Sequence, residues 1–275
     1  MKNLQSVRKL NNGISMPYVG LGVYKMDNPE ETVKAVKTAL SKGYRSIDTA
    51  AFYKNEDDVG RAVMESGVPR KDVFITSKVW NDDQGYDATL RAFEHSLEQL
   101  GTEYLDLYLI HWPVADKIHE TWKAMERLYD EGVIRSIGVS NFQIHHLRSI
   151  MKNGNIKPAV NQVELHPKLS QLPLREFCQK EDIAVEAWSP LARGRLLEEP
   201  VLAGMARNYN KTPAQIILKW HLENGVIIIP KSVRENRIRE NADLFDFELT
   251  AEDMKQIDNL HADERYGAHP DHFDF

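Results

Sequence analysis

Polar and ionisable side chains stand at the ends of apolar runs throughout this sequence, where parallel strands would bring them together. In chain order they are Asp48, Lys78, His111, Ser140, Asn141, Asn161, Gln162, Trp188, Ser189, Lys231 and Ser232. Asp, Lys and His can hold or transfer protons, and a lysine can also act as a nucleophile. Burying such groups costs free energy unless they are paired or used. Their repeated occurrence at strand ends predicts one pocket lined for chemistry.

Each of these residues, taken alone, also has a purely structural interpretation. Asp48 is of a type that caps turns, Lys78 fits a solvated strand end, and His111 fits a core histidine with satisfied hydrogen bonds. Asn161 and Gln162 fit a bulge inside a strand. The prediction of a pocket therefore depends on their coincidence at one edge and not on any single residue.

The runs that carry these residues are short, rich in β-branched side chains and nearly all apolar. They are Val19–Gly22, Tyr44–Asp48, Val73–Val79, Leu105–His111, Ile137–Ser140, Ala159–Glu164, Ala184–Trp188 and Val226–Pro230. Such runs are typical of strands buried on both faces of a parallel sheet.

Amphipathic segments with helix start and stop signals separate the runs. Pro29 suits a first helical position and Gly43 a helix C-terminus, while Thr212 and Gln215 form a capping box before a run that ends at Gly225. Eight strand–helix units without a linker favour one closed (β/α)8 TIM barrel over residues 1–275, with its chemistry at the C-terminal ends of the strands. A doubly wound open sheet is the alternative.

The segment "VRKLNNGISM" precedes the first unit and predicts a β-hairpin with Asn12 and Gly13 in the turn. We expect this hairpin to close the N-terminal end, or bottom, of the barrel.

Composition excludes several classes of partner. A net charge of −6 argues against a nucleic-acid surface, and no apolar run approaches the ~20 residues that a membrane helix needs. No secretory signal is visible, so we expect a cytoplasmic protein.

The single Cys178 fits a helix-face thiol, and no Cys–His spacing predicts a metal; His145 and His146 fit surface residues. With no amphipathic stripe left over, we expect a monomer.

Seven blocks of the sequence resemble, in order, the motifs of the aldo-keto reductase family. They are "GYRSIDTAAFYKNEDDVG" (residues 43–60), "ITSKVW", "LDLYLIHWP", "IGVSNF", "VNQVELHP", "AWSPLARG" and "IPKSVRENRIREN". The short loop after His111, Trp112 and Pro113 and the short tail resemble the prokaryotic branch, which includes glyoxal or methylglyoxal reductases and 2,5-diketo-gluconate reductases. The resemblance spans essentially the whole chain and implies a barrel that reduces aldehydes and ketones with NADPH.

Residue by residue, the resemblance assigns the catalytic roles to Asp48, Tyr53, Lys78 and His111. Negative charge builds on a carbonyl oxygen as hydride arrives, so a nearby group must stabilise it and supply a proton. Tyr53 is the expected acid. An ammonium at Lys78, held by Asp48, favours the phenolate and should ease proton release, and His111 should orient the substrate oxygen.

The resemblance also implies a cofactor cradle. Its residues are Gly22, Ser140, Asn141, Gln162, Trp188, Ser189, Leu191, Lys231, Ser232, Val233, Arg237, Glu240 and Asn241. Many family members have Tyr where this chain has Trp188, and stacking on a nicotinamide needs only a flat π face. Lys231 and Arg237 offer positive charge for phosphate, from which we expect NADPH over NADH.

Tyr24, Trp80 and Trp112, with His111, are expected to wall an apolar substrate slot. With short loops we expect an open pocket for small activated carbonyls such as methylglyoxal. Two other functions compete with reduction. A non-catalytic NADPH-binding barrel acting through a protein partner is disfavoured by the intact catalytic set. A Schiff-base aldolase would need Lys78 neutral, whereas Asp48 should keep it charged.

Overall fold

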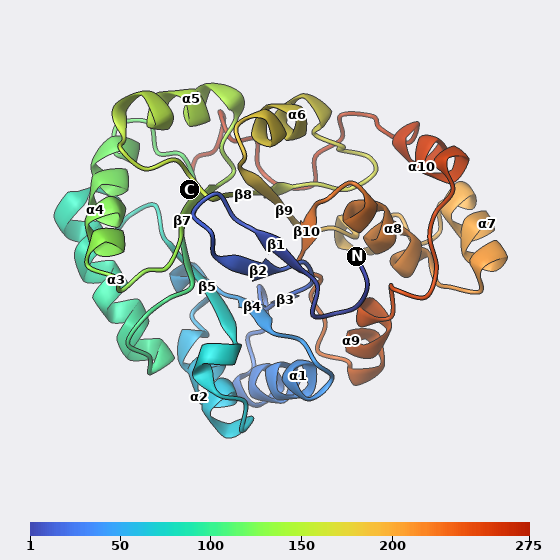
Figure 1. Ribbon diagram of the computed structural model, residues 1–275, viewed down its shortest axis with the longest axis horizontal. Helices are drawn as coiled ribbons and strands as arrows, with labels where there is room; N and C mark the ends of the chain where they lie inside the picture. The colour runs from blue at the N-terminus through green and yellow to red at the C-terminus, as the bar shows by residue number, and fades with distance from the viewer.

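Eight parallel strands in sequential order form the centre of the computed structural model, which describes residues 1–275 (Figure 1). The strands are β3 (Leu21–Gly22), β4 (Ser46–Asp48), β5 (Phe74–Val79), β6 (Leu107–Ile110), β7 (Ile137–Ser140), β8 (Val160–Glu164), β9 (Ala184–Trp188) and β10 (Ile227–Ile228). Each lies within one of the predicted runs. Several are shorter than predicted, mostly because they begin one or two residues later.

The sheet closes on itself beside β3 and β10. Val19 forms a parallel bridge with Ile228. The amide of Gly20 donates to the carbonyl of Ile228 at 2.8 Å, and the amide of Ile228 donates to the carbonyl of Tyr18 at 2.9 Å. An open doubly wound sheet has no such contact between its outer strands, so that alternative is wrong and the predicted barrel is confirmed.

A ring of helices covers the outside of the barrel (Figure 1). The helices are α1 (Pro29–Ser41), α2 (Glu56–Glu65), α3 (Tyr86–Leu100), α4 (Ile118–Asp130), α5 (Ile144–Asn153), α6 (Leu172–Lys180), α7 (Pro200–Tyr209), α8 (Pro213–Glu223), α9 (Glu235–Ala242) and α10 (Ala251–Asp258). The main apolar core lies between strands and helices and includes the fully buried Trp122 and Trp220. None of the helices combines the length and apolarity needed to cross a membrane.

The predicted helix signals act as expected. In α8 the hydroxyl of Thr212 accepts from the amide of Gln215, whose side chain accepts from the amide of Thr212, which forms the capping box. Pro29 opens α1, and Gly43 follows that helix with φ of +97°, a conformation that favours glycine.

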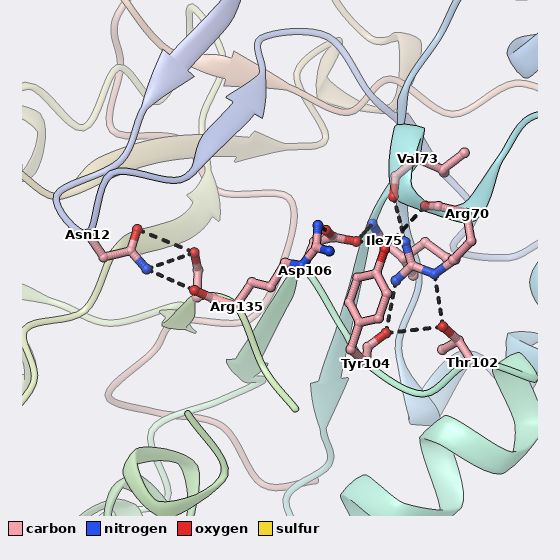
Figure 2. A network of polar contacts seen from close by, with 9 residues as sticks. Asn12, Arg70, Val73, Ile75, Thr102, Tyr104, Asp106 and Arg135 are labelled. Carbon is pink, nitrogen blue, oxygen red and sulfur yellow. Dashed lines mark hydrogen bonds and ion pairs between the residues drawn. The ribbon is translucent and has the colours of Figure 1, made fainter. Parts of the chain in front are cut away.

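The N-terminal hairpin closes the bottom of the barrel, as predicted. Strands β1 (Val7–Lys9) and β2 (Ser15–Pro17) are antiparallel, and the turn between them is closed by the amide of Gly13 donating to the carbonyl of Leu10 at 2.9 Å. Leu10 and Met16 are buried in a cluster with residues from the starts of the barrel strands. The Asn12 side chain donates to the carbonyl of Arg135 at 2.9 Å, which ties the turn to the barrel (Figure 2).

A buried carboxylate organises the polar contacts beside this turn (Figure 2). Asp106, ahead of β6, accepts from Arg70 at 2.8 Å, from Arg135 at 3.1 Å and from the amide of Ile75 at 3.0 Å. The Tyr104 ring lies within 4.1 Å of the Arg70 guanidinium and 4.0 Å of that of Arg135. One carboxylate thus joins the loops that begin β5, β6 and β7.

We expect Asp106→Asn to lower the free energy of unfolding by about 2 kcal/mol, because two guanidinium groups lose the charge that compensates them. Urea unfolding followed by circular dichroism measures this. Glu131→Gln is the control, since it breaks only an exposed pair with Arg127 and should cost less than about 1 kcal/mol. Equal losses for the two variants would contradict the structural role of Asp106.

Candidate active site

A cavity of about 1000 Å³ opens at the C-terminal ends of the strands. Asp48 at the end of β4, His111 after β6, Ser140 at the end of β7, Gln162 in β8 and Trp188 at the end of β9 all line it. The sequence-based prediction that polar strand ends meet in one pocket is therefore matched by the structure.

Most of the residues expected at the site share this cavity. Those that line it are Gly22, Tyr24, Asp48, Tyr53, Trp80, His111, Trp112, Ser140, Asn141, Gln162, Trp188, Ser189, Leu191, Lys231, Ser232, Arg237, Glu240 and Asn241. Lys78 and Val233 do not line it: Lys78 lies behind Tyr53 and Asp48, and Val233 packs against the core. Asn161 faces outward to donate to the carbonyl of Phe142, since neighbours in a strand point to opposite faces.

Lys78, in β5, is fully buried and makes three polar contacts. Its Nζ donates to Asp48 Oδ1 at 2.7 Å, to the carbonyl of Thr49 at 2.8 Å and to the hydroxyl of Tyr53 at 3.3 Å. These partners take all three ammonium donors. The interpretation of Lys78 as a solvated strand end is wrong. Tyr53 and Asp48 form one wall of the cavity, and Lys78 lies behind them.

Charge within this cluster is set by burial and by the ion pair. Burial is the largest single effect on Lys78 and disfavours the ammonium, but the negative charges and hydrogen bonds around it, led by the Asp48 carboxylate, together raise the lysine pKa above its usual value. A charged lysine is not a Schiff-base nucleophile, which argues against the aldolase alternative. Burial raises the pKa of Tyr53 to about 12, with Lys78 acting in the opposite direction. The phenol therefore holds its proton at neutral pH.

His111 presents a neutral imidazole to the cavity. Burial, and then the Lys78 charge, hold the pKa of His111 well below its usual value. Its ring stands edge-on to those of Tyr53 and Trp80, with centroids 5.7 and 5.1 Å away. Its Nδ1 atom is buried without a hydrogen-bond partner, which a satisfied core histidine would not show.

Asn141 holds the neighbouring wall together through its side-chain amide. It donates to the carbonyl of His111 at 2.9 Å and to Ser140 Oγ at 3.1 Å, and it accepts from the Trp188 indole at 2.8 Å. Ser140 Oγ in turn donates to the carbonyl of Gln162 at 2.9 Å. Asn141 has φ of +64°, which asparagine tolerates better than most residues. This backbone conformation lets the Asn141 side-chain amide contact His111, Ser140 and Trp188, which follow or end three different strands.

The C-terminal tail, which shows no regular sequence pattern, lies against the Trp188 ring. A Cβ atom on Gly267 would stand 2.3 Å from that ring, so the tail approaches closely only because the residue is glycine. The buried Glu164 carboxylate accepts from the amides of Tyr266 and Gly267 at 2.7 and 3.0 Å. Glu164 thereby fastens the tail over the side chain expected to stack on a nicotinamide. Sequence reasoning identified neither residue.

Positive side chains gather at the end of the cavity that follows β10. Lys231 and Arg237 both line it, and neither is paired with a carboxylate. Arg193 and Lys25, which the sequence analysis did not single out, also line the cavity. Unpaired cations beside the last strand match the place where TIM barrels often bind phosphate.

Aromatic rings form the cavity mouth. Tyr24, Trp80 and Trp112 line it as expected. Phe52 stacks on Trp80 with a centroid distance of 3.9 Å, and Phe275 stacks on the same indole at 5.9 Å. Both phenylalanines also line the cavity, so the tail adds an aromatic ring to this wall.

Two histidines expected at the surface hold the same tail. Nε2 of His145 and of His146 lie 3.2 and 3.5 Å from Asp271 Oδ1. Nδ1 of His146 accepts from the amide of Gln143 at 3.1 Å. That bond leaves the His146 imidazole proton on Nε2, facing the Asp271 carboxylate.

A barrel with a lined cavity at the C-terminal ends of its strands belongs to the class of (β/α)8 proteins whose sites occupy that face. The sequence model described as "Aldo/keto reductase family" matches residues 19–262. The chain therefore belongs to the aldo/keto reductase family, as its motifs predicted.

Similar proteins agree with this membership over nearly the full length. The chain is 58% identical to the glyoxal reductase of Bacillus subtilis (strain 168), covering 98% of each sequence. It matches the crystal structure of MGS-M4, an aldo-keto reductase from a Medee basin deep-sea metagenome library, with a TM-score of 0.96, 44% identity, and 98% and 100% coverage. A crystal structure of a Gox0644 mutant in complex with NADPH matches with a TM-score of 0.94, 46% identity, and 98% and 99% coverage.

Replacing Lys78 should expose the cost of the buried ion pair. We expect Lys78→Met to lower the free energy of unfolding by about 3–5 kcal/mol, because Asp48 is left as an unpaired buried carboxylate. The double variant Asp48→Asn with Lys78→Met should regain at least about 1 kcal/mol of that loss. Urea unfolding of the four proteins of the cycle measures both terms. Simple additivity of the two single losses would show that the pair is not coupled.

Proposed function

We propose that this protein reduces small aldehydes and ketones to alcohols with NADPH, with 2-oxoaldehydes such as glyoxal and methylglyoxal among its substrates. The observation that carries the proposal is the Tyr53 hydroxyl at the cavity wall, 3.3 Å from a buried, charged Lys78. The glyoxal reductase of B. subtilis, at 58% identity, supports this substrate class.

The residues of the cavity fit NADPH. The Trp188 ring, fixed by Asn141 and Gly267, offers a flat surface for the nicotinamide, and the side-chain oxygens of Ser140, Asn141 and Gln162 surround it with hydrogen-bond acceptors. Lys231 and Arg237 offer the charge for phosphates. The NADPH complex of Gox0644 has the same fold. When bound, NADPH supplies the hydride for the reduction.

Tyr53 supplies the proton in this scheme. As negative charge develops on the carbonyl oxygen, the phenol O–H bond breaks and the proton passes from Tyr53 to that oxygen. The phenolate left behind lies beside the Lys78 ammonium, which stabilises it, and Asp48 keeps the lysine charged and in place. The neutral His111 can donate a hydrogen bond to the same oxygen and so orient the substrate.

We propose that the protein works as a monomer, because the acid, its lysine and its aspartate meet within one chain and His111 lines the same cavity. No observation favours the alternative of a non-catalytic barrel that works through a protein partner. The acid, its lysine and its aspartate all stand in hydrogen-bonded contact.

Tyr53→Phe should abolish turnover and leave NADPH binding intact, because it removes the proton donor and keeps the ring. We expect kcat with methylglyoxal to fall by about 10²–10⁴-fold. Loss of NADPH absorbance measures turnover, and fluorescence titration measures the Kd for NADPH. Turnover within a fewfold of wild type would refute Tyr53 as the acid. A wild-type protein that binds NADPH but consumes none with a panel of carbonyls would favour the partner-binding alternative.

Arg237→Ala should lower the preference for NADPH over NADH, because we assign Arg237 to the additional phosphate of NADPH. We expect kcat/KM with NADPH to fall about tenfold to a hundredfold, which is the effect of losing one hydrogen bond between charged groups. The kcat/KM with NADH should stay nearly unchanged.

Arg239→Ala is the matched control, since Arg239 lies on the same helix but does not line the cavity. It should leave the ratio of the two cofactors unaltered. If Arg237→Ala leaves the ratio unaltered too, the assignment of Arg237 is wrong.

A further inference from the structure

Glu186, in the middle of β9, is a fully buried carboxyl group outside the catalytic cluster. Its Oε2 accepts from Gln162 Nε2 at 2.7 Å, whereas its Oε1 has no hydrogen-bond partner. No lysine, arginine or histidine forms an ion pair with it. A buried carboxyl group in the barrel interior is costly, so its one contact points to its role.

That contact completes the hydrogen bonding of the Gln162 amide nitrogen. Nε2 donates to Asp48 Oδ2 at 2.7 Å as well as to Glu186 Oε2 at 2.7 Å. A primary amide has two N–H donors, and here both are directed at carboxyl oxygens. A flipped amide would place its oxygen against those oxygens, so only one orientation of Gln162 is stable.

Two hydrogen bonds restrict the orientation of the Gln162 amide more than a single bond would. Asp48 alone would leave the Gln162 amide free to pivot about a single N–H bond. Carboxyl groups from β4 and β9, both at 2.7 Å, fix the amide plane and leave Oε1 as the polar atom of Gln162 without a protein donor. Gln162 lines the cavity, so this oxygen is its free group there.

The neighbours of Gln162 offer acceptors as well. The two N–H groups of Asn141 are directed at His111 and Ser140, and the Ser140 hydroxyl donates to the Gln162 carbonyl. The side chains of this wall therefore have lone pairs to spare and no free donors. A nicotinamide carboxamide carries two N–H donors on its NH₂ group, which is the complement of such a wall.

We propose that Glu186 is a positioning residue that fixes the Gln162 amide with its oxygen toward the cavity, so that the site selects a cofactor carboxamide by its NH₂ group. This inference rests on the proposed function, because it assumes that the nicotinamide binds against this wall.

The charge state of Glu186 is compatible with this role. Burial, followed by the nearby Asp48 carboxylate, raises the pKa of Glu186 to about 8. At neutral pH the group therefore largely keeps its proton, and its carbonyl oxygen still accepts from Gln162. The unpartnered Oε1 is the atom left to carry that proton. The two carboxyl groups around Gln162 can then share the barrel interior without two full negative charges.

The test compares NADP⁺ with its 3-acetylpyridine analogue, in which an acetyl group replaces the carboxamide and no NH₂ is present. Quenching of tryptophan fluorescence gives the Kd of each. We expect wild-type protein to bind NADP⁺ about tenfold more tightly than the analogue, the effect of one or two net hydrogen bonds. In Glu186→Leu, the side chain keeps a similar volume but cannot accept from Gln162 Nε2, so Asp48 alone holds the amide and the amide can pivot. The preference should fall to about twofold or less, mainly through weaker binding of NADP⁺.

Glu126→Leu is the matched control. Glu126 is also a buried carboxylate, but it accepts from the amides of Asn155 and Ile156 on the outer side of the barrel. This variant should keep the wild-type preference. Should Glu186→Leu fail to fold, Glu186→Asp replaces it, because a carboxyl group one methylene shorter cannot reach Gln162 in the same way and should also lower the preference.

The outcomes separate this inference from the function on which it rests. Wild-type preference retained in a folded Glu186 variant would overturn the role of Glu186 and leave the reductase proposal untouched. Equal Kd values of wild-type protein for NADP⁺ and the analogue would overturn the NH₂-selective wall. Failure of wild-type protein to bind either nucleotide would overturn the proposed function itself, and this inference with it.

Discussion

The buried ion pair between Lys78 and Asp48 is the interaction on which the site depends. Two charges in a barrel interior are costly unless good geometry and further hydrogen bonds compensate them. The structure supplies both: the partners come from adjacent strands, β5 and β4, and the lysine donors are taken by Asp48, Thr49 and Tyr53. The second oxygen of Asp48 is free to accept from Gln162 across the barrel. Tyr53, the expected acid, and Gln162, expected at the cofactor, are thus also partners that stabilise this pair.

Closure of the barrel allows the Asp48 carboxylate to contact both Lys78 on the adjacent strand and Gln162 on the opposite side. Asp48 lies on β4 and Gln162 on β8, far apart along the sheet order, yet their side chains meet at 2.7 Å because the sheet closes between β10 and the start of β3. From Gln162 the contacts continue to Glu186 on β9 and, through its backbone carbonyl, to Ser140 on β7. In an open sheet these groups would lie on separate stretches of one edge. The same residues would then have to be solvated or paired locally.

The sequence predicted the strands and the main lining residues because both follow from local patterns. Apolar runs that end in Asp48, His111 or Ser140 signal a strand and a rim position at once. Residues whose importance depends on contacts distant in sequence were missed. Gly267 matters because the Trp188 ring lies where its Cβ would be, and Phe275 because it stacks on Trp80. Glu186 did carry a signal, a charged residue in the apolar run "AVEAW", but its partner Gln162 is known only from the fold.

The environment of Tyr53 changes how Lys78 assists the proposed reduction. From the sequence we expected the ammonium to ease proton release by favouring the phenolate. In the structure burial is the larger effect, so the pKa of Tyr53 is raised to about 12 and Lys78 only limits the rise. An acid must begin the reaction protonated, and burial secures that. The ammonium acts afterwards, when a phenolate would otherwise be left unpaired beside Asp48. Burial and charge thus act at different stages: burial keeps the proton until a carbonyl oxygen can take it, and Lys78 stabilises the site once it has gone.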